Sequence, residues 1–138
     1  TLFNRLTKAN PDLIVLAGFM KKIPNKIVEH YNNKIMNIHP SLLPKYGGKG
    51  FYGMNVHRAV IEMNEKETGV TIHFVNNKYD DGEIIAQSRV KVMDDDKPED
   101  LARRVLLQEH KLYPEVIKAF CEHRIIWKNN KPQIIKGD

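Results

Sequence analysis

One short apolar run constrains the fold more than any other feature of the sequence. Residues Leu13 to Ala17 are all apolar, and Gly18 closes the run. A strand that is apolar on both faces is covered on both sides, and such strands are typical of parallel sheets. We therefore expect a buried strand here, and a buried strand needs a neighbouring strand along each of its edges.

The elements that follow alternate between helices and strands, as in α/β proteins. Helices are expected near Leu2 to Leu6, at 25–31 after Pro24, at 53–63 and at 97–123, where Pro114 should bend or interrupt the helix. Strands are expected at 35–39, at 70–75 and 84–92 as a late antiparallel element, and in a hairpin around 125–127 and 134–135. The segment 40–51 should form a loop. The sequence thus predicts one partial domain, residues 1–138, which forms the C-terminal part of an open, Rossmann-like, mostly parallel sheet with its N-terminal strands missing.

Composition narrows the possible partners. Lysine and arginine number 22 and aspartate and glutamate 17, a net charge of +5, but the basic residues are scattered, so no nucleic-acid partner is expected. We interpret the tightest basic pair, Arg103 and Arg104, as a solvated helix face. No apolar run is long enough to cross a membrane, and the single cysteine, Cys121, excludes an internal disulfide. These features predict a protein of a reducing compartment, the cytoplasm.

The strongest chemical signal is the string that begins Asn37-Ile38-His39-Pro40. Residues two apart on a strand point the same way, so Asn37 and His39 should project together from the carboxyl end of the strand. Open α/β sheets bind their ligands at that end. Two donors aimed at one point can stabilise a developing oxyanion. The alternative is a capped strand end with a hydrogen-bonded core histidine.

Two further groups of polar residues could take part in the same chemistry. Asp80 and Asp81, followed by Gly82, place carboxylates in a loop, and a carboxylate near a histidine raises its pKa and fixes its orientation. The alternative is an ordinary turn between strands. Glu109 follows in a helical segment, where it could accept hydrogen bonds from sugar hydroxyls or could simply face solvent.

Taken in order, these segments resemble a known family. The matching stretches are Pro11 to Met20, Asn37 to Tyr46, His73 to Val75, Asp80 to Gly82, and Gln108 to His110. The string from Asn37 to Pro44 is similar to one shared by all folate-dependent formyltransferases. The stretches Ala17 to Met20 and Gln108 to His110 resemble the phosphoribosylglycinamide formyltransferase branch more narrowly.

The resemblance implies a reaction and its substrates. A member of this branch transfers the formyl group of 10-formyltetrahydrofolate, its co-substrate, to the amino group of glycinamide ribonucleotide in purine synthesis, without a metal. Two alternatives remain: a formyltetrahydrofolate deformylase, in which water replaces the amine, and a folate-binding fragment that is inactive alone. The family's N-terminal half, which carries a phosphate-binding loop, has no counterpart among these residues.

The resemblance also implies roles for individual residues. Asn37, His39 and Asp80 would be catalytic, and Glu109 would bind the ribose of the nucleotide. The bond between Leu43 and Pro44 would be cis. The contacts of Gly47 to Gly53 stay open, because this loop is longer than in many relatives. The folate would contact Met20, Lys21, Lys22, Ile23, Asn37, Val75, Asn76, Asn77 and Asp80.

Overall fold

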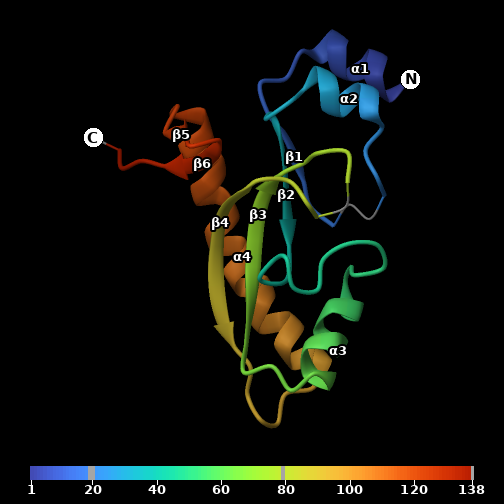
Figure 1. Cartoon of the computed structure of the whole chain (residues 1–138), viewed down its shortest axis with the longest axis vertical. Helices are drawn as coiled ribbons and strands as arrows, with labels where there is room; N and C mark the ends of the chain where they lie inside the picture. Colours follow the sequence, from blue (N-terminus) through green and yellow to red (C-terminus); the bar gives the residue numbers. More distant parts are fainter. Residues whose placement is uncertain (19–20, 79, 138) are drawn as a thin grey trace.

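The computed structural model describes residues 1–18, 21–78 and 80–137, and the predicted folate contact Met20 lies outside the described residues. Ten elements follow one another along the chain (Figure 1). They are α1 (Leu2–Ala9), β1 (Ile14–Leu16), α2 (Asn25–His30), β2 (Ile35–His39), α3 (Met54–Glu62), β3 (Glu67–Phe74), β4 (Ile84–Lys91), α4 (Pro98–Cys121), β5 (Ile125–Lys128) and β6 (Lys131–Ile134).

The predicted α/β class is confirmed by a four-stranded sheet in the order β1-β2-β3-β4. β1 and β2 are parallel, whereas β2–β3 and β3–β4 are antiparallel. The antiparallel part of the sheet therefore begins at β2, one strand earlier than the predicted late element. β3 also starts at Glu67 rather than at Val70, because its first residues pair with the far end of β4.

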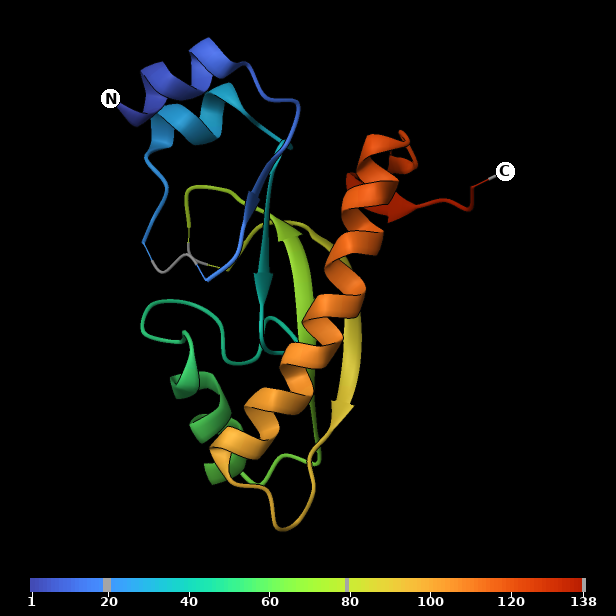
Figure 2. The same cartoon turned by 180° about the vertical axis from the view of Figure 1, so that it is seen from behind.

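Helix α4 covers one face of the sheet, as Figure 2 shows from behind. The alternation of side chains turns Met36, Ile38 and Ile72 toward this helix, where they form a core cluster with Tyr113 and Val116. The sequence predicted that Pro114 bends or interrupts this helix, and the helix runs through Pro114 without an interruption. Proline removes one backbone hydrogen bond, and the buried neighbours Tyr113 and Val116 hold the helix against the sheet on both sides of it.

The prediction of a fully buried first strand is not met within this chain. β1 forms an edge of the described sheet. Ile14 and Leu16 contact the core cluster between the strands and helices α1 and α2, but Val15 points the other way and is 41% exposed. Val15 pairs with Met36 and so lies on the α4 face of the sheet, but on the edge strand, where α4 leaves it partly exposed.

The elements outside the sheet agree with the sequence in part. The terminal hairpin forms as predicted, and Asn129 and Asn130 turn it with φ of 54° and 61°, the left-handed region that asparagine tolerates. Of the basic pair, Arg103 is exposed, as predicted, whereas Arg104 is partly exposed and its guanidinium donates two hydrogen bonds to Asp96, at 2.7 and 2.8 Å. The bond between Leu43 and Pro44 is cis, as predicted.

Candidate functional site

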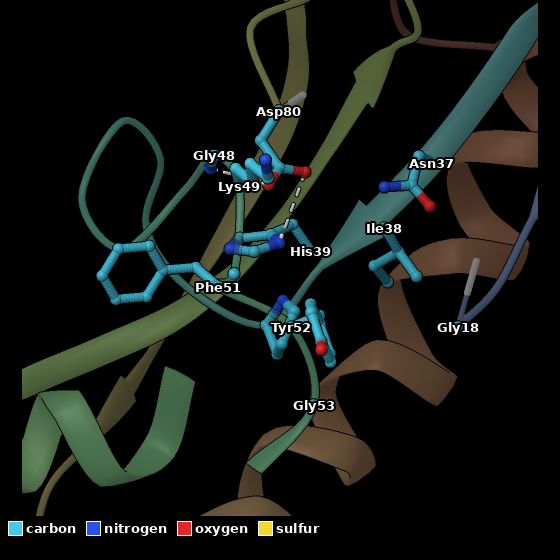
Figure 3. Close-up of a pocket in the computed structure, with 12 residues that line it drawn as sticks. Gly18, Asn37, Ile38, His39, Gly48, Lys49, Phe51, Tyr52, Gly53 and Asp80 are labelled. Carbon is cyan, nitrogen blue, oxygen red and sulfur yellow. Dashed lines mark hydrogen bonds and ion pairs between the residues drawn. The ribbon is translucent and has the colours of Figure 1, made fainter. Parts of the chain in front are cut away.

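A pocket of about 510 Å³ opens at the carboxyl ends of β1 and β2, the location predicted from the sequence (Figure 3). Asn37 and His39 both line it from β2, as their spacing of two residues requires. The pocket is lined by Gly18, Asn37, Ile38, His39, Pro40, Gly48, Lys49, Gly50, Phe51, Tyr52, Gly53 and Asp80.

His39 is buried and has a partner at each ring nitrogen. Its Nε2 lies 2.6 Å from the carbonyl oxygen of Tyr46, and this nitrogen carries the proton because a carbonyl can only accept. Its Nδ1 lies 3.5 Å from Oδ1 of Asp80, and the two side chains are 5% and 12% exposed. The proposed meeting of His39 and Asp80, which sequence could not establish, is therefore present in the structure.

Asp80 is held at this point by the backbone around it. Its other carboxylate oxygen accepts a hydrogen bond of 3.0 Å from the amide of Gly48. Asp80 itself has a φ of 51°. Gly82 has no room for a side chain, because a Cβ there would overlap the carbonyl oxygen of Phe74. The Asp-Asp-Gly sequence thus makes a tight turn that also aims one carboxylate at a histidine.

A second histidine, His73, belongs to the cluster and was not predicted as a site residue. It pairs with Asn37 across β2 and β3. Its Nδ1 donates to the carbonyl oxygen of Phe74 at 3.0 Å, so in the neutral ring Nε2 is left to accept from the side-chain amide of Asn37 at 3.4 Å. Burial lowers the pKa of His73, which favours this neutral form. A neutral His73 therefore sets which way the Asn37 amide points.

The Asn37 amide keeps unused hydrogen-bonding capacity. Its nitrogen has two hydrogens, and one of them serves His73. Its oxygen is buried and has no partner within the described part of the chain. A buried amide oxygen that lacks a partner, on a residue that lines a pocket, is available to a bound ligand.

One sequence signal could have revealed His73. Thr71 and His73 have the same two-residue spacing on the strand beside β2 as Asn37 and His39 have on β2.

The loop between β2 and α3 supplies seven of the twelve lining residues. Lys49 is the one lysine or arginine among the described lining residues, and Phe51 and Tyr52 are 37% and 47% exposed. Sequence left the contacts of this loop open. The structure places a cation and two aromatic rings of this loop around the pocket.

The predicted nucleotide contact, Glu109, lies on α4 and does not line this pocket. Burial raises the pKa of its carboxyl group. Tyr113, one turn later on the same helix face, donates its hydroxyl to the carbonyl oxygens of Leu16 and Met36 at 2.7 and 3.2 Å. α4 and β2 run in opposite directions (Figure 1). Since Tyr113 contacts Leu16 and Met36, Glu109, one turn earlier on α4, lies nearer the carboxyl ends of β1 and β2, on the sheet face opposite His39.

The remaining predicted folate contacts do not line the pocket. Lys21 and Lys22 are exposed, whereas Ile23 is 7% exposed and belongs to a core cluster. Val75 packs at the edge of the same cluster, and its amide bonds to Ile35 at 2.8 Å. The remaining two are Asn76, whose side chain accepts from the amide of Lys78 at 2.9 Å, and Asn77.

The described residues hold no group of three or more histidine, cysteine or acidic side chains arranged to bind a metal ion. Within the same residues, no helix has the length and apolar character needed to cross a membrane.

Comparison with known proteins identifies the family to which the chain belongs. Residues 1–117 match the family described as formyl transferase. The phosphoribosylglycinamide formyltransferase of Arabidopsis thaliana, named as chloroplastic, is 50% identical over 136 residues, which make up 99% of this chain and 47% of that protein. The chain spans about half the length of the curated relatives it matches.

Solved structures give the same fold. The phosphoribosylglycinamide formyltransferase of Anaplasma phagocytophilum superimposes with a TM-score of 0.89 at 36% identity, over 99% of this chain and 65% of that one. A formyltetrahydrofolate deformylase of Pseudomonas syringae superimposes with a TM-score of 0.87 at 26% identity, over 98% of this chain and 44% of that one. The fold is common to both enzymes, and the identity is higher to the formyltransferase.

Proposed function

Because this chain belongs to the formyl transferase family, we propose that its protein transfers the formyl group of 10-formyltetrahydrofolate to the amino group of glycinamide ribonucleotide. The observation that carries the proposal is the meeting of Asn37, His39 and Asp80 in one pocket at the carboxyl end of β2. The names of the relatives support the substrates and the place of the reaction in purine synthesis.

The proposed reaction forms one carbon–nitrogen bond and breaks another. The substrate amine adds to the formyl carbon, that carbon separates from the folate nitrogen, and the proton lost by the amine ends on the folate nitrogen. Asn37 offers its second amide hydrogen to the formyl oxygen as negative charge develops there. His39, when protonated, adds a positive charge beside it. His39 is buried and Asn37 is partly buried, and this low exposure strengthens these interactions.

Asp80 has two functions in this proposal. Its carboxylate lies 3.5 Å from Nδ1 and helps to fix the orientation of the His39 ring. The same carboxylate offers a base through which the amine proton can leave, because one of its oxygens stays free of the Gly48 amide. The reaction then needs positioning and electrostatic stabilisation. Asn37, His39 and Asp80 supply both, and His73 orients Asn37.

The binding residues remain proposals that the geometry supports to different degrees. Glu109 lies beside the carboxyl ends of β1 and β2 in a partly buried position, which suits a ribose contact at the sheet edge. The folate is proposed to contact Lys21, Lys22, Ile23 and the 75–77 segment around the pocket. A cytoplasmic location and the absence of a nucleic-acid partner stay predictions.

The test compares two acidic residues of α4 in the full-length protein. Glu109→Ala should raise the KM for the nucleotide about tenfold or more, since a lost hydrogen bond to a carboxylate costs that much, and should leave the KM for the folate unchanged. Glu115→Ala, an exposed residue of the same helix, is the matched control. Release of formate without the nucleotide, at a rate that Glu109→Ala does not change, would identify a deformylase and overturn the proposal.

A further inference from the structure

A row of three polar side chains crosses the sheet beside the pocket. His39 on β2 pairs with Thr71 on β3, and Thr71 pairs with Gln87 on β4. Residues that directly oppose each other on adjacent strands share a face of the sheet, so all three lie on the face away from α4. Thr71, in the middle of the row, is completely buried.

The Thr71 hydroxyl uses all of its hydrogen-bonding capacity. It donates to the carbonyl oxygen of Ser41 at 2.7 Å, and it accepts from the amide of Leu43 at 3.1 Å and from the side chain of Gln87 at 2.9 Å. One donated and two accepted bonds are the most that a hydroxyl can form. Gln87 donates in addition to the carbonyl oxygen of Leu43 at 3.0 Å, so the row holds both polar backbone groups of Leu43.

These bonds fix the turn that immediately follows His39. Ser41 adds a bond from its hydroxyl to the carbonyl oxygen of Lys45 at 2.6 Å. The next residue is Tyr46, whose carbonyl oxygen accepts the Nε2 hydrogen of His39. The hydrogen bonds of Thr71 thus hold, through the 41–45 turn, the group that orients the imidazole ring of His39.

We infer that Thr71 is a positioning residue for His39, acting through the 41–46 turn. Thr71 does not line the pocket, and its hydroxyl has no capacity left for a substrate, so it acts only through the turn. The expected effect on catalysis rests on the proposed function, whereas the effect on the orientation of His39 does not. Gln87 supports Thr71 from the outer strand. Its side chain is more exposed, so it contributes less than Thr71.

The test uses two threonines of the same strand in the full-length protein. Thr71→Val keeps the shape and removes the hydroxyl. It should lower kcat about tenfold or more with the KM for the folate unchanged, because the backbone of the turn loses its buried partners. Thr71→Ser, which keeps a hydroxyl, should restore kcat. Thr68→Val is the matched control, because Thr68 is 3% exposed and its hydroxyl has no partner within the described residues. Gln87→Ala should lower kcat less than Thr71→Val does. If Thr71→Val fails to fold, Gln87→Ala still tests whether the hydrogen bonds to Thr71 and Leu43 position His39.

A second readout separates this inference from the proposed reaction. The Nε2 hydrogen of His39 can be observed by NMR in ¹⁵N-labelled protein without substrate, where its bond to Tyr46 should protect it from exchange. The resonance should be present in the wild type, Thr71→Ser and Thr68→Val, and lost or broadened in Thr71→Val. A wild-type protein that shows this pattern but transfers no formyl group would overturn the proposed function alone. Unchanged kcat and resonance in Thr71→Val, or equal losses in Thr68→Val, would overturn the positioning role.

Discussion

The interaction between Asp80 and His39 can be tested by removing one charge. Asp80→Asn keeps the size of the side chain, and the amide oxygen can still accept from the backbone of Gly48. At 3.5 Å, a unit charge pair interacts by about 1 kcal/mol in water and by about 5 kcal/mol at the effective dielectric constant near a protein surface. This energy applies when His39 is protonated, and the low exposure of the two side chains, 5% and 12%, limits its screening by solvent.

We therefore expect Asp80→Asn to lower kcat at least about a hundredfold, which corresponds to a loss of about 3 kcal/mol of transition-state stabilisation. Initial rates of formyl transfer, followed by the absorbance of the folate as it loses its formyl group, measure this effect. Asp81→Asn provides the control, because Asp81 is the adjacent carboxylate, is exposed and does not line the pocket. A thermal melt of each variant confirms that it is folded.

Two outcomes would refute this reasoning. If Asp80→Asn keeps a third or more of the wild-type kcat, the charge on Asp80 does not act on the reacting centre. If Asp81→Asn loses as much activity as Asp80→Asn, the effect comes from the charge of the loop as a whole. Only a loss confined to Asp80 agrees with the contact between its carboxylate and Nδ1 of His39.

Two predictions concern stability. Gly82→Ala should lower the free energy of unfolding by about 1–3 kcal/mol in denaturant titrations, because the new Cβ overlaps the backbone carbonyl of Phe74, and unchanged stability would mean that the loop has room to adjust. The Arg104 guanidinium lowers the pKa of the Asp96 carboxyl, so this ion pair stabilises the fold above the ordinary pKa of an aspartate and ceases to do so as the pH falls through the lowered pKa. Asp96→Asn should then be less stable than the wild type at neutral pH and equally stable at strongly acidic pH, whereas Asp94→Asn, an exposed neighbour, should follow the wild type throughout.

Patterns within single segments predicted the helices and strands and, in the site, the common direction of Asn37 and His39. The spacing of apolar residues located each helix and strand to within a few residues, because it records which side of an element faces the core. The spacing of Asn37 and His39 fixed their common direction for the same reason. The exposure of Val15 and the pairing of Arg104 with Asp96 could not be read in this way, because both depend on what lies next to the residue in space.

His73 and Thr71 were missed because the register between strands was unknown. A shift of one residue in the pairing of β2 with β3 would turn both side chains toward α4 and bring Ile72 into the pocket. The register also changes locally between Ile72 and His73 on the β4 side. Sequence can state that Thr71 and His73 share a face, but only the paired sheet shows that this is the face of Asn37 and His39.

The length of the loop after β3 explains why Asp80 can reach His39. β3 ends with Phe74 opposite Met36, three residues before His39 on β2, so the chain leaves the sheet about 10 Å away from the histidine. The five steps from Val75 to Asp80 can span at most about 18 Å, which is enough to return along β2 and place a carboxylate beside His39. The chain must then come back to pair Ile84 with His73, and Gly82 lets it pass against the carbonyl of Phe74 on the way. Asp80 lies near the middle of this loop, where the chain comes closest to His39, and its carboxylate makes the contact. Asp81 lies after this point and does not line the pocket.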